Sequence, residues 1–160
     1  AALLILSAMP ALLANYSRRI LPGRGQDYTA SLWAESREQA RFAVRPELLP
    51  QYRAAVRFIL DHGDGQIGVL SLGNGWEYPL WQMLHAEGAK GLRIEHVFPE
   101  PAASPASYPL GPFHPSLIVV IRRLQPSEPP SPLVVDGRRW RRAFDRPALS
   151  IYLPCPRACG

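Results

Sequence analysis

The sequence predicts a small α/β domain, a three-layer, Rossmann-like fold whose sheet is mainly parallel. Two observations carry this prediction. The apolar run at residues 67–72 is followed by a helical pattern and then by a second strand pattern at residues 92–97, which is the order of a β-α-β unit. A third apolar run, at residues 116–121, has the composition of a buried strand. We therefore expect these three strands inside a sheet of four to six strands, packed with two or three helices.

The chain opens on an uncharged run, residues 1–14, that is interrupted only by Ser7 and Pro10. Crossing a bilayer takes about 20 apolar residues, so this run is too short to cross alone. The end of a transmembrane helix is the favoured interpretation, and a signal-peptide core or a buried helix remain as alternatives. The predicted division is thus a transmembrane or apolar helix ending at residue 21, a connecting segment at residues 22–46, the soluble α/β domain at residues 47–154, and a tail at residues 155–160.

Helical signals precede the first strand. Ser36 and Gln39 have the spacing of a capping box, in which each side chain bonds the backbone of the other. Further along, Tyr52, Val56 and Ile59 recur at helical spacing. Glycines then end the pattern, so this helix leads directly into the first strand.

The C-terminal half reads as loops and antiparallel strands. Residues 99–115 are rich in proline and small residues and predict a loop. Two strand patterns flank Asp136-Gly137, a strong hairpin signal. Residues 148–153 predict the strand that closes the sheet, and we place the hairpin at an antiparallel edge.

The chain is basic, with a net charge of +5 and a sequence pI near 9.7. Clustered arginines suit phosphate groups, yet the arginines are scattered except at residues 18–19, 122–123 and 138–142. No nucleic-acid-binding motif accompanies them. We therefore expect no nucleic-acid partner. Contact with lipid phosphates is one alternative for Arg18 and Arg19, and it applies on either face of a membrane.

The sequence predicts no metal site and no cofactor. Cys155 and Cys159 form one pair, whereas structural zinc sites normally need four ligands. A terminal disulfide and two unbonded thiols both remain open. The histidines at positions 62, 85, 96 and 114 share no ligand spacing.

A binding crevice is predicted where the first strand ends. Glycines follow that strand and Pro79 begins a helical pattern, an arrangement that places ligands at the carboxyl end of a strand. Asn74, Trp76 and Glu77 are the tentative ligand-binding residues, because an aromatic face and a carboxylate suit a sugar. The alternative is that the aromatic residues only pack the helix, and in either case we expect Tyr78 and Trp81 to be buried against the sheet.

The glycines also suggest a dinucleotide fingerprint, which is incomplete. Gly73 and Gly75 fit its first two positions, and Glu95 lies where a ribose-binding carboxylate would fall. Tyr78 occupies the third glycine position, where the helix must approach the strand closely. Nucleotide or S-adenosylmethionine binding therefore stays the alternative function. No nucleophile elbow is present, and we assign no catalytic residue.

The order of these segments resembles the C-terminal soluble region of polytopic C-type glycosyltransferases, the dolichyl-phosphate-mannose protein mannosyltransferase-like family. The resemblance covers roughly residues 10–153. Its segments are Asn15-Tyr16-Ser17-Arg18-Arg19-Ile20-Leu21-Pro22, Arg45-Pro46-Glu47-Leu48-Leu49-Pro50-Gln51-Tyr52, Ile67-Gly68-Val69, Trp76-Glu77-Tyr78-Pro79-Leu80-Trp81 and Arg93-Ile94-Glu95-His96-Val97. The fourth of these is the most specific.

This resemblance implies an accessory domain of a membrane enzyme that transfers a sugar from a polyprenyl-phosphate carrier to an extracytoplasmic acceptor. The family's catalytic carboxylate lies in an early loop between membrane helices, outside this chain. The implied partners are membrane lipid and, through the missing membrane region, the lipid-linked sugar donor. The implied location is the inner membrane with the domain on the extracytoplasmic side, from which Arg18-Arg19 departs, because arginines beside a membrane segment usually mark the cytoplasmic side.

Overall fold

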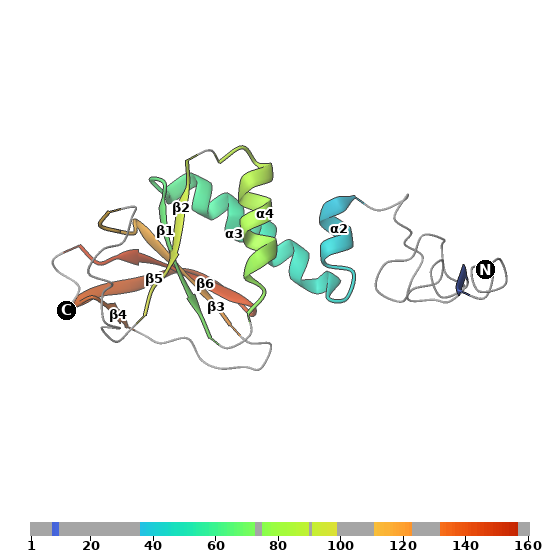
Figure 1. Ribbon diagram of the computed structural model, residues 1–160. Helices are drawn as coiled ribbons and strands as arrows, with labels where there is room; N and C mark the ends of the chain where they lie inside the picture. The colour runs from blue at the N-terminus through green and yellow to red at the C-terminus, as the bar shows by residue number, and fades with distance from the viewer. Residues whose placement is uncertain are drawn as a thin grey trace. The chain divides into compact units, whose positions relative to one another are not determined.

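The computed structural model describes residues 8–9, 36–72, 75–89, 91–98, 111–122 and 132–156 (Figure 1). Of the predicted N-terminal apolar helix, only residues 8 and 9 belong to this part, and both are helical. The remainder of that prediction lies outside the described residues. Within the described residues, no helix combines the length and the apolar character needed to cross a bilayer.

The chain divides into two compact units, Ala1–Leu49 and Pro50–Gly160. In the first unit, α2 (Arg37–Arg41) begins after Ser36, whose hydroxyl accepts a hydrogen bond from Gln39 N at 3.2 Å. The Gln39 side-chain oxygen accepts in return from Ser36 N at 3.0 Å, so the predicted capping box is confirmed. The short 3-10 helix η1 (Pro46–Leu48) follows, and proline at its first position suits a helix start.

The second unit is built on a six-stranded mixed sheet. Its strands are β1 (Gln66–Ser71), β2 (Arg93–His96), β3 (Leu117–Ile121), β4 (Leu133–Val135), β5 (Arg138–Arg146) and β6 (Leu149–Pro154), in the order β2-β1-β3-β6-β5-β4. β1 pairs in parallel with β2 and β3, and the other three pairs are antiparallel. The α/β class is confirmed. The sheet is only partly parallel, and β2 lies at an edge rather than inside.

The predicted hairpin joins β4 to β5. Asp136 and Gly137 have φ angles of 48° and 70°, which are the left-handed conformations of a tight two-residue turn. Only glycine, asparagine or aspartate adopt such angles at little cost, so these two residues fix the register of Val135 opposite Arg138. The hairpin forms the edge of the sheet opposite β2.

Two helices, α3 (Leu49–His62) and α4 (Glu77–Ala86), cover one face of the sheet (Figure 1). Ile94, Ile67 and Leu117 are neighbours across β2, β1 and β3 and therefore share a face. Leu84 of α4 lines the same hollow as Ile94, and a Cβ on Gly63, just after α3, would lie 3.4 Å from Leu117. Both helices thus cover this one face, and the predicted third layer of helix is not found among the described residues.

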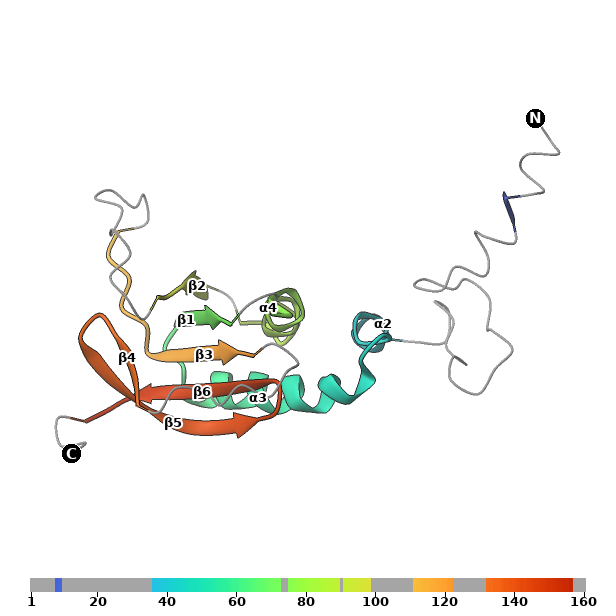
Figure 2. The same ribbon diagram turned by 90° about the horizontal axis from the view of Figure 1, so that it is seen from below.

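The opposite face is covered by the curl of the sheet itself (Figure 2). One apolar cluster on this face contains residues from both the parallel and the antiparallel half of the sheet. Its members are Leu70, Val97, Ile118, Val120, Leu133, Val135, Trp140 and Tyr152, and Leu72 and Phe113 pack against it. A bulge between Arg142 and Phe144 increases the bend of β5. The antiparallel half therefore buries this face and forms a second core.

Candidate functional site

The carboxyl end of β1 leads into α4, as the sequence predicts. α4 begins at Glu77 with Trp76 at the N-cap position, so Pro79 is the third helical residue rather than the first. A proline is tolerated there, because the first N–H groups of a helix have no partner within the helix. Trp76 and Glu77 are both partly exposed at this end of the sheet, as predicted, and Asn74 lies outside the described residues.

Glu77 forms a hydrogen-bonded pair with His96, the last residue of β2. The distance between Glu77 Oε2 and His96 Nε2 is 2.8 Å. A carboxylate at the first turn of a helix interacts favourably with the helix dipole. The two side chains are 23% and 50% exposed, so both remain accessible to a ligand. Sequence reasoning did not assign His96 to the site, although its place at the end of a strand parallel to β1 was the signal for it.

Tyr52 of α3 contacts the backbone just before α4. Its hydroxyl donates to the backbone carbonyl of Trp76 at 2.8 Å. Burial, and next the negative charge of Glu77, raise the pKa of Tyr52 well above its ordinary value. The phenol therefore stays protonated and keeps its donor role, which fixes the backbone at the start of α4.

Gly75 is required by close packing. A Cβ at this position would lie 2.7 Å from Ser71 Oγ and 2.9 Å from Ile121 Cγ2. Both distances are far below the ordinary contact of about 3.5–4.0 Å. The glycine lets the chain pass directly over the ends of β1 and β3, which explains it without a bound phosphate.

The prediction that Tyr78 and Trp81 are buried is wrong. Tyr78 is 65% exposed and Trp81 is 40% exposed. The side of α4 that faces the sheet carries Leu80, Met83 and Leu84, so Tyr78 and Trp81 lie outside that apolar stripe. Trp81 instead lines an open hollow of about 350 Å³ between α4 and β2, together with Leu84, His85, Ala89, Leu92, Arg93, Ile94 and Glu95.

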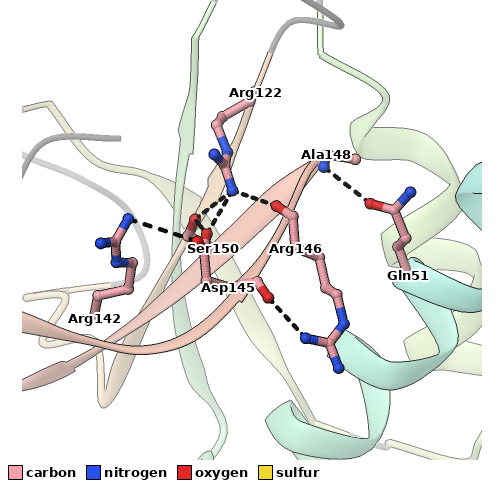
Figure 3. Close-up of polar contacts among 7 residues, drawn as sticks. All are labelled: Gln51, Arg122, Arg142, Asp145, Arg146, Ala148 and Ser150. Atoms are coloured by element: carbon pink, nitrogen blue, oxygen red, sulfur yellow. Dashed lines mark hydrogen bonds and ion pairs between the residues drawn. The ribbon is translucent and has the colours of Figure 1, made fainter. Parts of the chain in front are cut away.

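A polar cluster that the sequence did not reveal lies at the end of β3 (Figure 3). Arg122 is the residue after β3, and its side chain is only 10% exposed. Its Nη2 donates to Asp145 Oδ1 at 2.5 Å, to Ser150 Oγ at 2.9 Å and to the carbonyl of Arg146. Ser150 Oγ in turn donates to Asp145 Oδ1 at 2.6 Å. The cluster ties the end of β3 to the β5–β6 connection.

The cluster also controls the charge of Asp145. Burial would raise the pKa of this carboxyl, but the hydrogen bond from Ser150 and the positive charges of Arg122 and Arg142 outweigh burial and lower it. Gln51 of α3 joins the same region, because its Oε1 accepts from the Ala148 N–H at 3.0 Å (Figure 3). These contacts link a helix and three strands, so we interpret the cluster as structural.

No protein-family model matches the chain, and no match was found among the curated proteins or the solved structures.

The described residues offer no group of three or more histidine, cysteine, aspartate or glutamate side chains that could hold a metal ion. Cys155 is half-buried after β6, and its backbone N–H donates to the carbonyl of Arg139 at 3.0 Å. Cys159 lies outside the described residues, so the two alternatives for the cysteine pair stay open.

Proposed function

We propose that this chain is a soluble accessory domain of a membrane glycosyltransferase, which moves a sugar from a polyprenyl-phosphate carrier to an extracytoplasmic acceptor. Within it, Trp76, Glu77 and His96 form a sugar-contacting site, here called the Trp76 corner. The observation that carries this proposal is the 2.8 Å pair between Glu77 and His96, directly after a partly exposed indole, at the carboxyl ends of two parallel strands.

The pair has a definite hydrogen-bonding character. An ionised carboxylate only accepts, so His96 Nε2 must carry the proton that joins it to Glu77 Oε2. In the neutral imidazole, Nδ1 is then left as an acceptor on the side of the ring that faces away from Glu77. This nitrogen and the second oxygen of Glu77 are acceptors that suit the hydroxyl groups of a sugar, and the indole of Trp76 suits its apolar face.

We place the chemistry of transfer outside this chain and assign no catalytic residue to the Trp76 corner. Among the described residues, the Glu77–His96 pair belongs to no group of three or more histidine, cysteine, aspartate or glutamate side chains that could hold a metal ion. The apolar run at residues 1–14 and the order of segments support attachment to a membrane region, with the domain on the extracytoplasmic side of the inner membrane. The membrane region would bind the lipid-linked donor, and the accessory domain would meet the transferred sugar or the acceptor.

A second candidate is a freestanding Rossmann-like domain that binds a nucleotide or S-adenosylmethionine. The strand order β2-β1-β3, with α4 connecting β1 to β2, favours this second candidate. In sheets of this order, nucleotides bind in the crevice at the carboxyl ends of the strands, where the strand order reverses. The packing role of Gly75 and the bulk of Tyr78 argue against it, since the glycine is explained by its neighbours Ser71 and Ile121.

The test is a binding titration of the 160-residue chain with methyl mannoside, methyl glucoside, ADP and S-adenosylmethionine. One of the sugars should bind to the native chain. Trp76→Ala should weaken that binding roughly two- to tenfold, because one aromatic contact contributes about 0.5–1.5 kcal/mol, and it should change the free energy of unfolding little. Trp81→Ala is the matched control, a partly exposed tryptophan on the same helix, and should leave binding unchanged. The full-length enzyme should lose sugar transfer with Trp76→Ala and retain it with Trp81→Ala.

Two results would overturn the proposal. Equal sugar binding by the native chain and the Trp76→Ala variant removes the Trp76 corner from the site. Binding of ADP or S-adenosylmethionine in preference to both sugars favours the second candidate.

A further inference from the structure

The hairpin formed by β4 and β5, here called the arginine hairpin, carries an excess of positive charge. Five exposed arginines lie on β5: Arg138, Arg139, Arg141, Arg142 and Arg146. The only acids between residues 133 and 146 are Asp136 and Asp145, so the hairpin has an excess charge of +3 in a chain whose net charge is +5. Most of the basic character of the protein is thus concentrated on one edge of the sheet.

Part of this charge has no counter-ion among the described residues. Asp145 pairs with Arg122 and, at 3.7 Å, with Arg142. Within the part of the chain that the structure describes, Arg138, Arg139 and Arg141 form no ion pair. No acid among the described residues therefore neutralises these three guanidinium groups.

The strand register divides these three groups between the two faces of the hairpin. Arg138 lies opposite Val135, on the face that carries the buried Trp140, whereas Arg139 and Arg141 lie on the other face. Val134 lies opposite Arg139, so the two side chains share a face, and Arg141, two residues further along β5, shares it as well. Val134 is 42% exposed, whereas Leu133 and Trp140 point to the other face and are buried. The outer face of the arginine hairpin therefore combines an exposed apolar side chain with flanking arginines, at an edge strand that pairs on one side only (Figure 2).

We propose that the outer face of the arginine hairpin docks on an anionic bilayer surface, with Arg139 and Arg141 at lipid phosphates and Val134 among the headgroups. Guanidinium groups pair with phosphates in a planar, two-pronged geometry, and an apolar side chain beside them suits the boundary of the bilayer. The choice of a bilayer rests in part on the proposed function, since a domain tethered to a membrane region meets that surface at high effective concentration.

Nucleic acid is the competing partner for such a surface. Single-stranded nucleic acid is bound by basic grooves in which aromatic side chains stack on the bases. Here Trp140 is 1% exposed, and the ring of Phe144 packs against Phe58 of α3 with centroids 5.4 Å apart. The described hairpin thus offers charge without a stacking platform, which favours the bilayer.

The test is flotation of the full 160-residue chain with vesicles of phosphatidylcholine alone and of phosphatidylcholine mixed with phosphatidylglycerol. Each basic residue near an anionic surface contributes about a fivefold gain in partitioning, so Arg138→Gln, Arg139→Gln and Arg141→Gln together should lower binding to the mixed vesicles roughly 100-fold. The triple variant and the native chain should partition equally to vesicles of phosphatidylcholine alone. Any contribution of residues 1–14 would dominate that partitioning. Raising the salt concentration should reduce binding of the native chain to the mixed vesicles, a readout that needs no variant.

The matched control removes the same charge elsewhere, through Arg37→Gln, Arg53→Gln and Arg57→Gln, three exposed positions on helices. Equal losses in both triple variants, or binding of the native chain that ignores salt, would overturn the proposal. So would tighter binding of the native chain to single-stranded DNA than to the mixed vesicles at the same salt. Sugar titration separates the two proposals. The hairpin variant should bind sugar as the native chain does, whereas the proposed function fails by the results of the Trp76→Ala and ADP titrations, whatever the vesicles show.

Discussion

Replacing Gly75 with alanine tests whether this glycine serves packing or a bound phosphate. The new methyl group would lie 2.7 Å from Ser71 Oγ and 2.9 Å from Ile121 Cγ2, so both neighbours would have to retreat by roughly 1 Å to reach ordinary contact. Ile121 is 1% exposed and is held between β1 and β6, which leaves it little room. Overpacking of this kind costs about 1–3 kcal/mol, and we expect about 2 kcal/mol for Gly75→Ala.

The assay is urea unfolding of Gly75→Ala, Ser71→Ala and the double variant. Ser71→Ala removes the nearer of the two obstructing atoms and leaves Ile121 in place. The cost of Gly75→Ala should therefore fall by roughly 0.5–1.5 kcal/mol in the Ser71→Ala background. Gly88→Ala is the control, because its φ of 78° makes its cost conformational and its Cβ meets nothing within 4 Å, so its cost should simply add to that of Ser71→Ala.

A different outcome would refute this reasoning. If Gly75→Ala leaves the free energy of unfolding unchanged and shows no coupling to Ser71→Ala, the glycine is not a packing residue. Loss of ADP or S-adenosylmethionine binding in that stable variant would then make Gly75 part of a phosphate loop.

Two further predictions concern α4 and the cluster at the end of β3. Leu80→Ala should lower the free energy of unfolding by about 2–5 kcal/mol because Leu80 is fully buried, whereas Trp81→Ala should cost about 1 kcal/mol or less, and equal costs in urea unfolding would contradict the observed face of the helix. Asp145→Asn should destabilise the domain at neutral pH. Because folding lowers the pKa of Asp145 below its ordinary 3.8, the difference in stability between the variant and the native chain should be full above pH 3.8 and should disappear as the pH falls through the lowered pKa. A difference that persists unchanged to acid pH in thermal unfolding would show that the Asp145 charge contributes nothing.

The sequence predicts the elements of the fold better than their arrangement. Strand, helix and strand around Gly75 are found within one or two residues of the expected bounds, and the Asp136-Gly137 turn has the expected conformation. These features depend on local periodicity and on turn residues. The place of β6 between β3 and β5 depends on pairing between distant segments, and an apolar strand has the same pattern whichever neighbour it joins.

The candidate site also divides into a part that depends on local sequence, which could be predicted, and a part that depends on contacts between distant segments, which could not. Trp76 and Glu77 lie in the short connection and first turn of helix after β1, so their exposure at the end of that strand could be inferred. His96 reaches Glu77 only because β2 lies parallel to β1, a contact across 19 residues of sequence. Trp81 was expected in the core from its residue type, but the stripe of Leu80 and Met83 decides which side of a ten-residue helix faces the sheet.

The position of β6 has a consequence for the order in which the domain forms during synthesis. β1, β2 and β3 leave the ribosome first, yet the neighbour of β3 is Leu149–Pro154, which emerges after β4 and β5. Until then β3, which is wholly apolar, presents an unpaired edge that other chains could join. The β5–β6 pair is local in sequence and forms quickly once both strands are out. Folding of the domain therefore ends with one insertion event, in which β6 closes the edge of β3 and joins the two halves of the sheet.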